Sequence, residues 1–150
     1  MALAGGCGGD ARQPAAAAPA PAPPGANATL PLPLGFYVGS DTPCGEASNA
    51  TLALLHREGL NGAREFCRFA TLERTGPDTF RATESCSATG TGEEWSIAVE
   101  WEILGPTAFR RTSEEGWVSE FRFCEQASLP EPWRDNDISE LTGQAARVGA

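Results

Sequence analysis

The chain has 150 residues and a formal net charge of −9, and all eleven of its cationic residues are arginines. This length allows one domain, and the 41% of hydrophobic residues, with seven phenylalanines and four tryptophans, suffice for one modest core. A chain this acidic has no electrostatic footprint for nucleic acid, so a charged partner is expected to be cationic, unless the negative surface serves only solubility.

The N-terminus carries small residues before a solitary cysteine, Cys7. The pattern resembles the end of a bacterial lipoprotein signal, in which such a cysteine is lipidated and becomes the first residue. Leu3 lies four positions before the cysteine instead of three, and the charged and hydrophobic regions of a signal peptide are missing. Either the start is truncated or misassigned, or the match is a chance feature of a Gly/Ala-rich end. Because a lone exposed thiol is a liability in an exported protein, we assign residues 1–7 to a signal remnant and predict lipidation of Cys7.

Residues 8–34 are rich in alanine and proline and are predicted to form a disordered linker. Fully extended at about 3.1 Å per residue, the linker reaches up to roughly 80 Å. No run of 18 apolar residues occurs in the chain, so no helix is expected to span a membrane. We therefore expect an exported, periplasmic or envelope protein whose only membrane attachment is the lipid on Cys7.

From residue 35 onward the residue pattern predicts an all-β domain, which we assign to residues 35–136. Apolar residues alternate with polar ones from Trp95 to Ile103, with Trp101 on the apolar parity, and this period of two indicates a half-buried strand. Six further strands are expected at 36–38, 51–56, 65–75, 79–86, 108–111 and 117–123. Short Gly-containing turns separate them, one of which is assigned to residues 59–62. About seven strands joined in this way predict a small antiparallel meander that closes into a barrel or a sandwich.

Four cysteines lie inside this segment, and they predict two disulfides that staple the domain. Cys67 and Cys86 are equidistant from a hairpin tip at Gly76-Pro77, which would place their Cβ atoms opposite each other and within disulfide reach. Cys44 and Cys124 then remain as the second pair, although four cysteines permit three pairings. Free buried thiols are an alternative. A zinc site is disfavoured, because the chain has no Cys-x-x-Cys pair and a single histidine.

The residues after the strands lose the alternating pattern, and residues 137–150 are assigned to a C-terminal tail. Trp133 is expected to pack back on the domain, and Asp137 followed by Glu140 predicts one capped helical turn. The last ten residues are expected to be disordered.

No residue pattern predicts a catalytic, cofactor or metal site, so we do not expect an enzyme. His56 has no nucleophile or orienting acid near it in the sequence and is interpreted as a surface residue at a strand end. The acidic residues Glu93, Glu94, Glu100 and Glu102 offer a paired-carboxylate site for glycoside chemistry, but a solvent-facing strand explains them more simply.

Several short motifs resemble those of short envelope proteins of Gram-negative bacteria that have no assigned activity: residues 35–38, 42–44, 47–52 and 128–134. The resemblance covers roughly residues 35–138 and brings no activity with it. A looser likeness is to the membrane-bound inhibitors of C-type lysozyme, which the chain resembles in size, lipid anchor and small-barrel plan. The basic and aromatic motif of those inhibitors is missing here, so no residue role is carried over.

Together these features predict an envelope lipoprotein domain that acts by binding a protein partner. One form of this hypothesis is inhibition of a cationic partner such as a lysozyme, and the second is a structural or scaffolding lipoprotein. An enzyme with an acidic site is the third and least favoured alternative.

Overall fold

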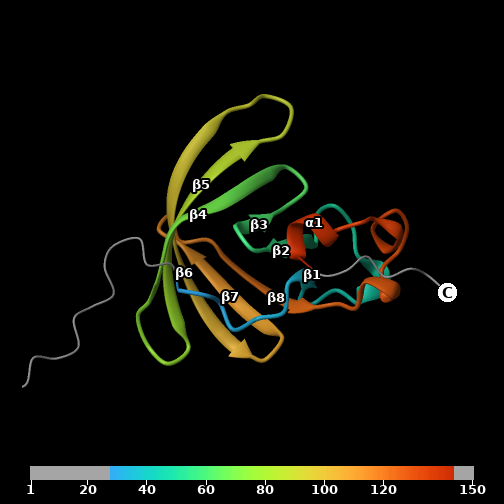
Figure 1. Cartoon of the computed structure of the whole chain (residues 1–150), viewed down its shortest axis with the longest axis horizontal. Helices are drawn as coiled ribbons and strands as arrows, with labels where there is room; N and C mark the ends of the chain where they lie inside the picture. Colours follow the sequence, from blue (N-terminus) through green and yellow to red (C-terminus); the bar gives the residue numbers. More distant parts are fainter. Residues whose placement is uncertain (1–27, 144–150) are drawn as a thin grey trace, which may run out of the picture.

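The computed structural model describes residues 28–143, in which eight antiparallel strands form a closed barrel (Figure 1). Each strand pairs with its neighbour in the sequence, and β8 returns to pair with β1. The strands are β1 (Gly35–Gly39), β2 (Leu52–His56), β3 (Gly59–Asn61), β4 (Glu65–Arg74), β5 (Thr79–Ala88), β6 (Glu94–Gly105), β7 (Ala108–Ser113) and β8 (Val118–Phe123). The predicted all-β meander is thus confirmed as a barrel.

The eighth strand is β3, which the sequence analysis assigned to a turn. Its three residues pair with both β2 and β4, so Leu60 lies between Leu55 and Cys67 in the ladder. The approach to β4 is so close that a Cβ atom on Gly59 would lie 1.9 Å from the carbonyl oxygen of Cys67. Glycine is therefore required at this position. Gly59, which in the sequence indicated a turn, allows β3 to pair closely with β4.

The long β4–β5 hairpin carries one of the two disulfides. Cys67 and Cys86 are direct ladder partners with Cα atoms 4.1 Å apart, as the symmetric hairpin predicted. The register shifts between Phe69 and Thr71, where a bulge inserts one extra residue on β4.

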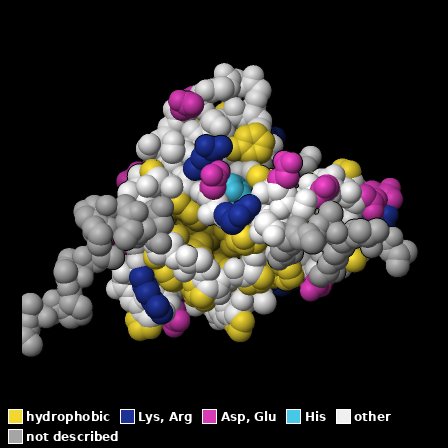
Figure 2. All heavy atoms as spheres, viewed as in Figure 1, with side chains coloured by type: hydrophobic (Ala, Val, Ile, Leu, Met, Phe, Trp, Pro, Cys, Tyr) yellow, Lys and Arg dark blue, Asp and Glu magenta, His cyan; other side chains and the backbone are white. Residues whose placement is uncertain are grey.

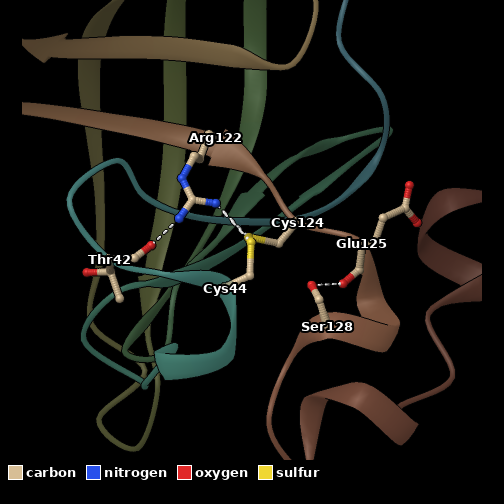
Figure 3. The surroundings of a disulfide bond; sticks show 6 residues. All are labelled: Thr42, Cys44, Arg122, Cys124, Glu125 and Ser128. Carbon is tan, nitrogen blue, oxygen red and sulfur yellow. Dashed lines mark hydrogen bonds between the residues drawn. A yellow bond between two sulfur atoms is a disulfide. The ribbon is translucent and has the colours of Figure 1, made fainter.

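The second disulfide joins Cys44 to Cys124, the pair also expected from the sequence, and links the chain after β1 to the end of β8. Arg122 lies beside it, with one guanidinium nitrogen 2.9 Å from the Sγ atom of Cys44 and another donating to the carbonyl of Thr42 (Figure 3). On the other side of the bridge Ser128 donates a hydrogen bond of 2.6 Å to the carbonyl of Glu125. The disulfide thus joins the segment that follows β1 to the end of β8, next to the place where these two strands pair and close the barrel.

The barrel interior is filled by aromatic side chains. Trp101 is fully buried, which confirms the predicted inward parity of β6, and the neighbouring Glu100 is exposed. The ring of Phe109 lies between Trp101 and Tyr37, with centroid distances of 4.6 and 5.0 Å. The Tyr37 hydroxyl donates to the carbonyl of Pro33, and burial raises the pKa of this phenol.

The folded part begins earlier than residue 35. Residues 28–34 lie against the barrel (Figure 1), where the backbone N–H of Ala28 donates to the carbonyl of Leu72 and where Leu30 and Leu32 are buried in the core. The assignment of 28–34 to a disordered linker is therefore wrong, because alternate leucines in this Pro-containing stretch supply apolar surface that the barrel buries. The rest of the predicted linker and Cys7 lie outside the described residues.

The folded part also ends later than residue 136. After β8 come the short 3-10 helices η2 (Gln126–Ser128) and η3 (Trp133–Asp135), and then a single helical turn, α1 (Ser139–Thr142). Trp133 packs on the domain as expected, and the Asp137 carboxylate accepts a hydrogen bond of 3.0 Å from the backbone N–H of Ser139. The carbonyl of Leu141 accepts from the N–H of Arg57, so residues 137–143 are docked on the end of β2 and are not a free tail. Among the described residues, none of the helices has the length and apolarity needed to cross a membrane.

Candidate functional site

A hollow of about 600 Å³ opens between residues 28–34 and the strands β2 and β4. Figure 2 faces this hollow: hydrophobic side chains show in the middle of the view, and charged side chains and the histidine stand around them. We call it the apolar groove. Its floor and walls are Ala28, Leu30, Leu32, Leu34, Leu55, Phe69 and Leu72, and its rim is Thr29, His56, Arg57, Glu58 and Arg68.

His56 belongs to the rim but is buried, so its assignment as a surface residue is wrong. In the tight connection from β2 to β3, Nδ1 of the imidazole accepts a hydrogen bond of 3.2 Å from the backbone N–H of Glu58. The proton therefore sits on Nε2, which donates to Oδ1 of Asn61 at 3.1 Å. Both ring nitrogens are engaged, and the imidazole fixes the loop that carries the charged rim.

The two arginines of the rim hold their charges at the groove mouth. Arg68 is exposed and only loosely paired with Glu58, at 3.7 Å, and an exposed pair at this distance contributes little. Arg57 donates to the backbone carbonyl of Glu140 in α1, which holds the guanidinium in place without neutralising it. The mouth of the groove therefore carries a local positive charge on an acidic protein.

A second cluster lies inside the barrel around Glu84, whose side chain is fully buried. One carboxylate oxygen accepts from Nε1 of Trp101 at 3.0 Å, and the other accepts from the buried guanidinium of Arg111. This guanidinium also lies over the Trp101 ring at 5.1 Å and over the Trp117 ring at 5.4 Å. We call Glu84, Trp101 and Arg111 the interior cluster; Trp117, which is 40% exposed, lies at its outer edge.

The strand pattern explains why these charged residues are inside. Glu84 shares the inward parity of β5 with Phe80, Ala82 and Cys86, and Arg111 shares that of β7 with Phe109. Removal from water disfavours the charged carboxylate and raises the pKa of Glu84, against the opposing effect of the Arg111 charge. The carboxyl also lies close to the Cys67–Cys86 bridge, with ligand atoms of the three residues within 4.8 Å of one another. Because both sulfurs are in a disulfide, this group has no thiolates to offer a metal.

Glu84 and Arg111 are not among the residues that the sequence predicted as a candidate site, which were other carboxylates. Glu93, Glu94 and Glu100 are exposed, and Glu102 forms a partly exposed ion pair with Arg110. None of these four residues lines the apolar groove or belongs to the interior cluster. The signal that was available is the alternation around Glu84, where an acidic residue occupies a core position between Ala82 and Cys86.

Comparisons with protein-family models, with curated proteins and with solved structures find no match to this chain. The resemblance to envelope proteins that the short motifs suggested therefore stays a prediction.

Proposed function

We propose that this domain acts by binding and that the apolar groove takes an amphipathic ligand with an aliphatic chain and an anionic head. The observation that carries the proposal is the pairing of a leucine-lined hollow with two arginines at its mouth, Arg57 and Arg68. Each methylene moved from water into such a hollow contributes about 0.8 kcal/mol, so an aliphatic chain supplies the affinity. The arginines supply the preference for an anionic head.

Binding is favoured over catalysis by the state of the titratable groups near the groove. His56 uses both ring nitrogens to hold the loop, so it is not poised as a general base. Glu84 is hydrogen-bonded through both oxygens inside the barrel. The groups that reach the groove mouth are instead charged side chains suited to holding a ligand.

The test uses 11-(dansylamino)undecanoate, a fluorescent fatty acid, titrated with the 150-residue chain in its oxidised form. Saturable enhancement of dansyl fluorescence is expected, and Leu34→Trp should weaken it because Leu34 is half-buried in the groove wall and a larger side chain fills the space. Leu104→Trp is the matched control, since Leu104 is exposed and lies away from the groove. Absence of saturable binding, or equal loss in both variants, would refute the proposal.

The head-group part of the proposal has its own comparison. Replacing Arg57 and Arg68 together by glutamine should weaken binding of the dansyl acid and leave binding of its methyl ester unchanged. Arg81→Gln, at an exposed position of β5 outside the groove, should leave both unchanged. If the acid and the ester lose affinity equally, the arginines do not recognise the charge.

We also propose that the domain is held at a bacterial envelope by a lipid on Cys7. The supporting observation is the separation of the cysteines into two disulfides and one further residue, Cys7, at the N-terminal end. Expressed with a complete lipoprotein signal, the protein should partition into detergent, and Cys7→Ser should release it as periplasmic material. An unchanged distribution of the Cys7→Ser variant would refute the anchor.

A second candidate function is inhibition of a cationic enzyme such as a lysozyme. It is favoured by the net charge of −9 and by exposed carboxylates at two turns of the barrel, Glu93 and Glu94 at the start of β6 and Glu114 and Glu115 after β7. If these residues bind such an enzyme, inhibition of hen-egg lysozyme should weaken at raised salt and disappear when all four are changed to glutamine. No inhibition at low salt would rule this candidate out.

A further inference from the structure

A second hollow, of about 560 Å³, opens at another side of the barrel and reaches the interior cluster through Arg111. Its apolar lining comes from Leu52, Ala53, Leu60 and Phe121, and its outer edge from Asn49, Ala50, Gly62, Ala63, Arg64 and Glu65. None of these residues lines the apolar groove, so the two hollows are separate.

Polar groups at this end of the barrel are left without partners. Within the described part of the chain, Nε of Arg111 and the hydroxyls of Ser113 and Ser119 are buried and accept or donate no hydrogen bond. Ser119 is the ladder partner of Arg111, and Ser113 lies two residues further along the same face of β7. Buried donors are nearly always paired in folded proteins, so the unpaired Nε of Arg111 and the two serine hydroxyls near it call for an acceptor.

Arg111 is also unusually well fixed for an arginine. Its side chain is 6% exposed, and it is held between two indole rings and by Glu84. A guanidinium has five donors, and Glu84 engages only one of its nitrogens. The side chain is therefore pre-organised, and a ligand that reaches it loses little side-chain entropy.

We propose that this hollow is a second binding site, which takes a small molecule with one carboxylate on an apolar body and pairs the carboxylate with Arg111. The apolar body lies against Leu52, Leu60 and Phe121. A single negative charge fits better than a phosphate, because Glu84 and Glu65 lie near Arg111 and repel a second charge. This site is independent of the apolar groove.

The probe for the test is 4-phenylbutyrate, titrated into the ¹⁵N-labelled 150-residue chain, with the four tryptophan indole N–H signals as readout. The Trp117 signal should shift and saturate, because the guanidinium of Arg111 lies over that ring. The uncharged 4-phenylbutyramide should bind about tenfold more weakly, as expected for loss of one charge-assisted hydrogen bond. A Trp117 signal that never moves, or equal binding of acid and amide, would overturn the proposal.

Two variants separate this site from a purely structural ion pair. Ala50→Trp, at an exposed position on the edge of the hollow, should abolish the Trp117 shift without unfolding the barrel. Glu84→Gln keeps the side-chain shape and removes the carboxylate that competes for Arg111, so it should tighten 4-phenylbutyrate binding by about tenfold. Binding that is unchanged in both variants would mean that Arg111 only holds the core together. Loss of the Trp117 shift in Leu34→Trp would place the probe in the apolar groove and equally contradict the assignment.

Discussion

The indole N–H of Trp101 donates a 3.0 Å hydrogen bond to Glu84, although the two residues are not partners in the β5–β6 ladder. The ladder partner of Trp101 is Phe80, and that of Glu84 is Ile97, so the indole reaches the carboxylate diagonally along the inner face of these two adjacent strands. In this way a single side chain fills the core and also supplies a donor to a buried charge. A change at Trp101 is therefore expected to affect both the packing of the core and the stability of the buried Glu84 carboxylate.

The first prediction concerns the burial of Trp101. Trp101→Ala should lower the free energy of unfolding by about 3–5 kcal/mol, because it leaves a cavity and takes a donor from Glu84. Glu100→Ala, on the exposed face of the same strand, should change it by no more than about 0.5 kcal/mol. Urea melts of the two variants and the parent measure this. A larger loss in the Glu100 variant would mean that the two faces of β6 are exchanged.

The second prediction concerns the buried pair of Glu84 and Arg111. Arg111→Met alone should destabilise the fold by about 3–5 kcal/mol, since it leaves a buried carboxylate without its partner. The double variant Glu84→Leu with Arg111→Met should recover most of that loss, because no unpaired charge remains. A double-mutant cycle by urea unfolding provides the comparison. Additive losses would show that the two side chains are not coupled.

The third prediction is a pH dependence carried by Glu84. Burial raises its pKa above the ordinary 4.5, so between that value and the raised pKa the folded chain binds more protons than the unfolded chain. The contribution of Glu84 to stability is therefore fully present in acid and is lost as the pH rises through this window. The difference in free energy of unfolding between the parent and Glu84→Gln should fall as the pH increases. A difference that grows with pH would show that the Arg111 charge outweighs burial and lowers this pKa.

The fourth prediction ranks the two disulfides. The Cys44–Cys124 bridge closes a sequence separation of 80 residues and the Cys67–Cys86 bridge one of 19. In the chain-entropy model these loops contribute about 4.5 and about 3 kcal/mol. Replacing Cys44 and Cys124 by serine should therefore lower the urea midpoint more than replacing Cys67 and Cys86 by alanine. The reverse order would indicate that packing around the interior bridge outweighs loop entropy.

Much of the barrel was predictable because its long strands alternate cleanly. The period of two around Trp101 placed that residue inside, and the hairpin symmetry placed Cys67 opposite Cys86. The strand β3 was missed because three residues are too few to show an alternation of apolar and polar residues. In addition, a glycine such as Gly59 is equally typical of a turn and of a close approach between two strands. The ends of the domain were missed for a related reason, since Leu30 and Leu32 are buried by tertiary contacts that a Pro-rich composition conceals.

The candidate sites were less accessible to sequence reasoning than the fold. Glu84 and Arg111 are far apart in the chain. They meet only because their side chains, on β5 and β7, both point into the barrel. Charged residues are expected at the protein surface by default, so the burial of Glu84 and Arg111 is not anticipated. Glu100 and Glu102 were considered as a candidate site in place of these two residues. The burial of His56 could not be predicted, because its partners, the backbone of Glu58 and the side chain of Asn61, are brought to it only by the pairing of β2 with β3.

The docking of residues 28–34 has a practical consequence for recombinant work on this protein. An expression fragment that starts at Gly35 retains all eight strands but discards Leu30 and Leu32, which cover part of the core. Such a fragment exposes Leu72 and Phe69 to water, and the resulting hydrophobic patch promotes aggregation. A fragment boundary upstream of Ala28 keeps the hydrogen bond from Ala28 to Leu72 and with it the wall of the groove.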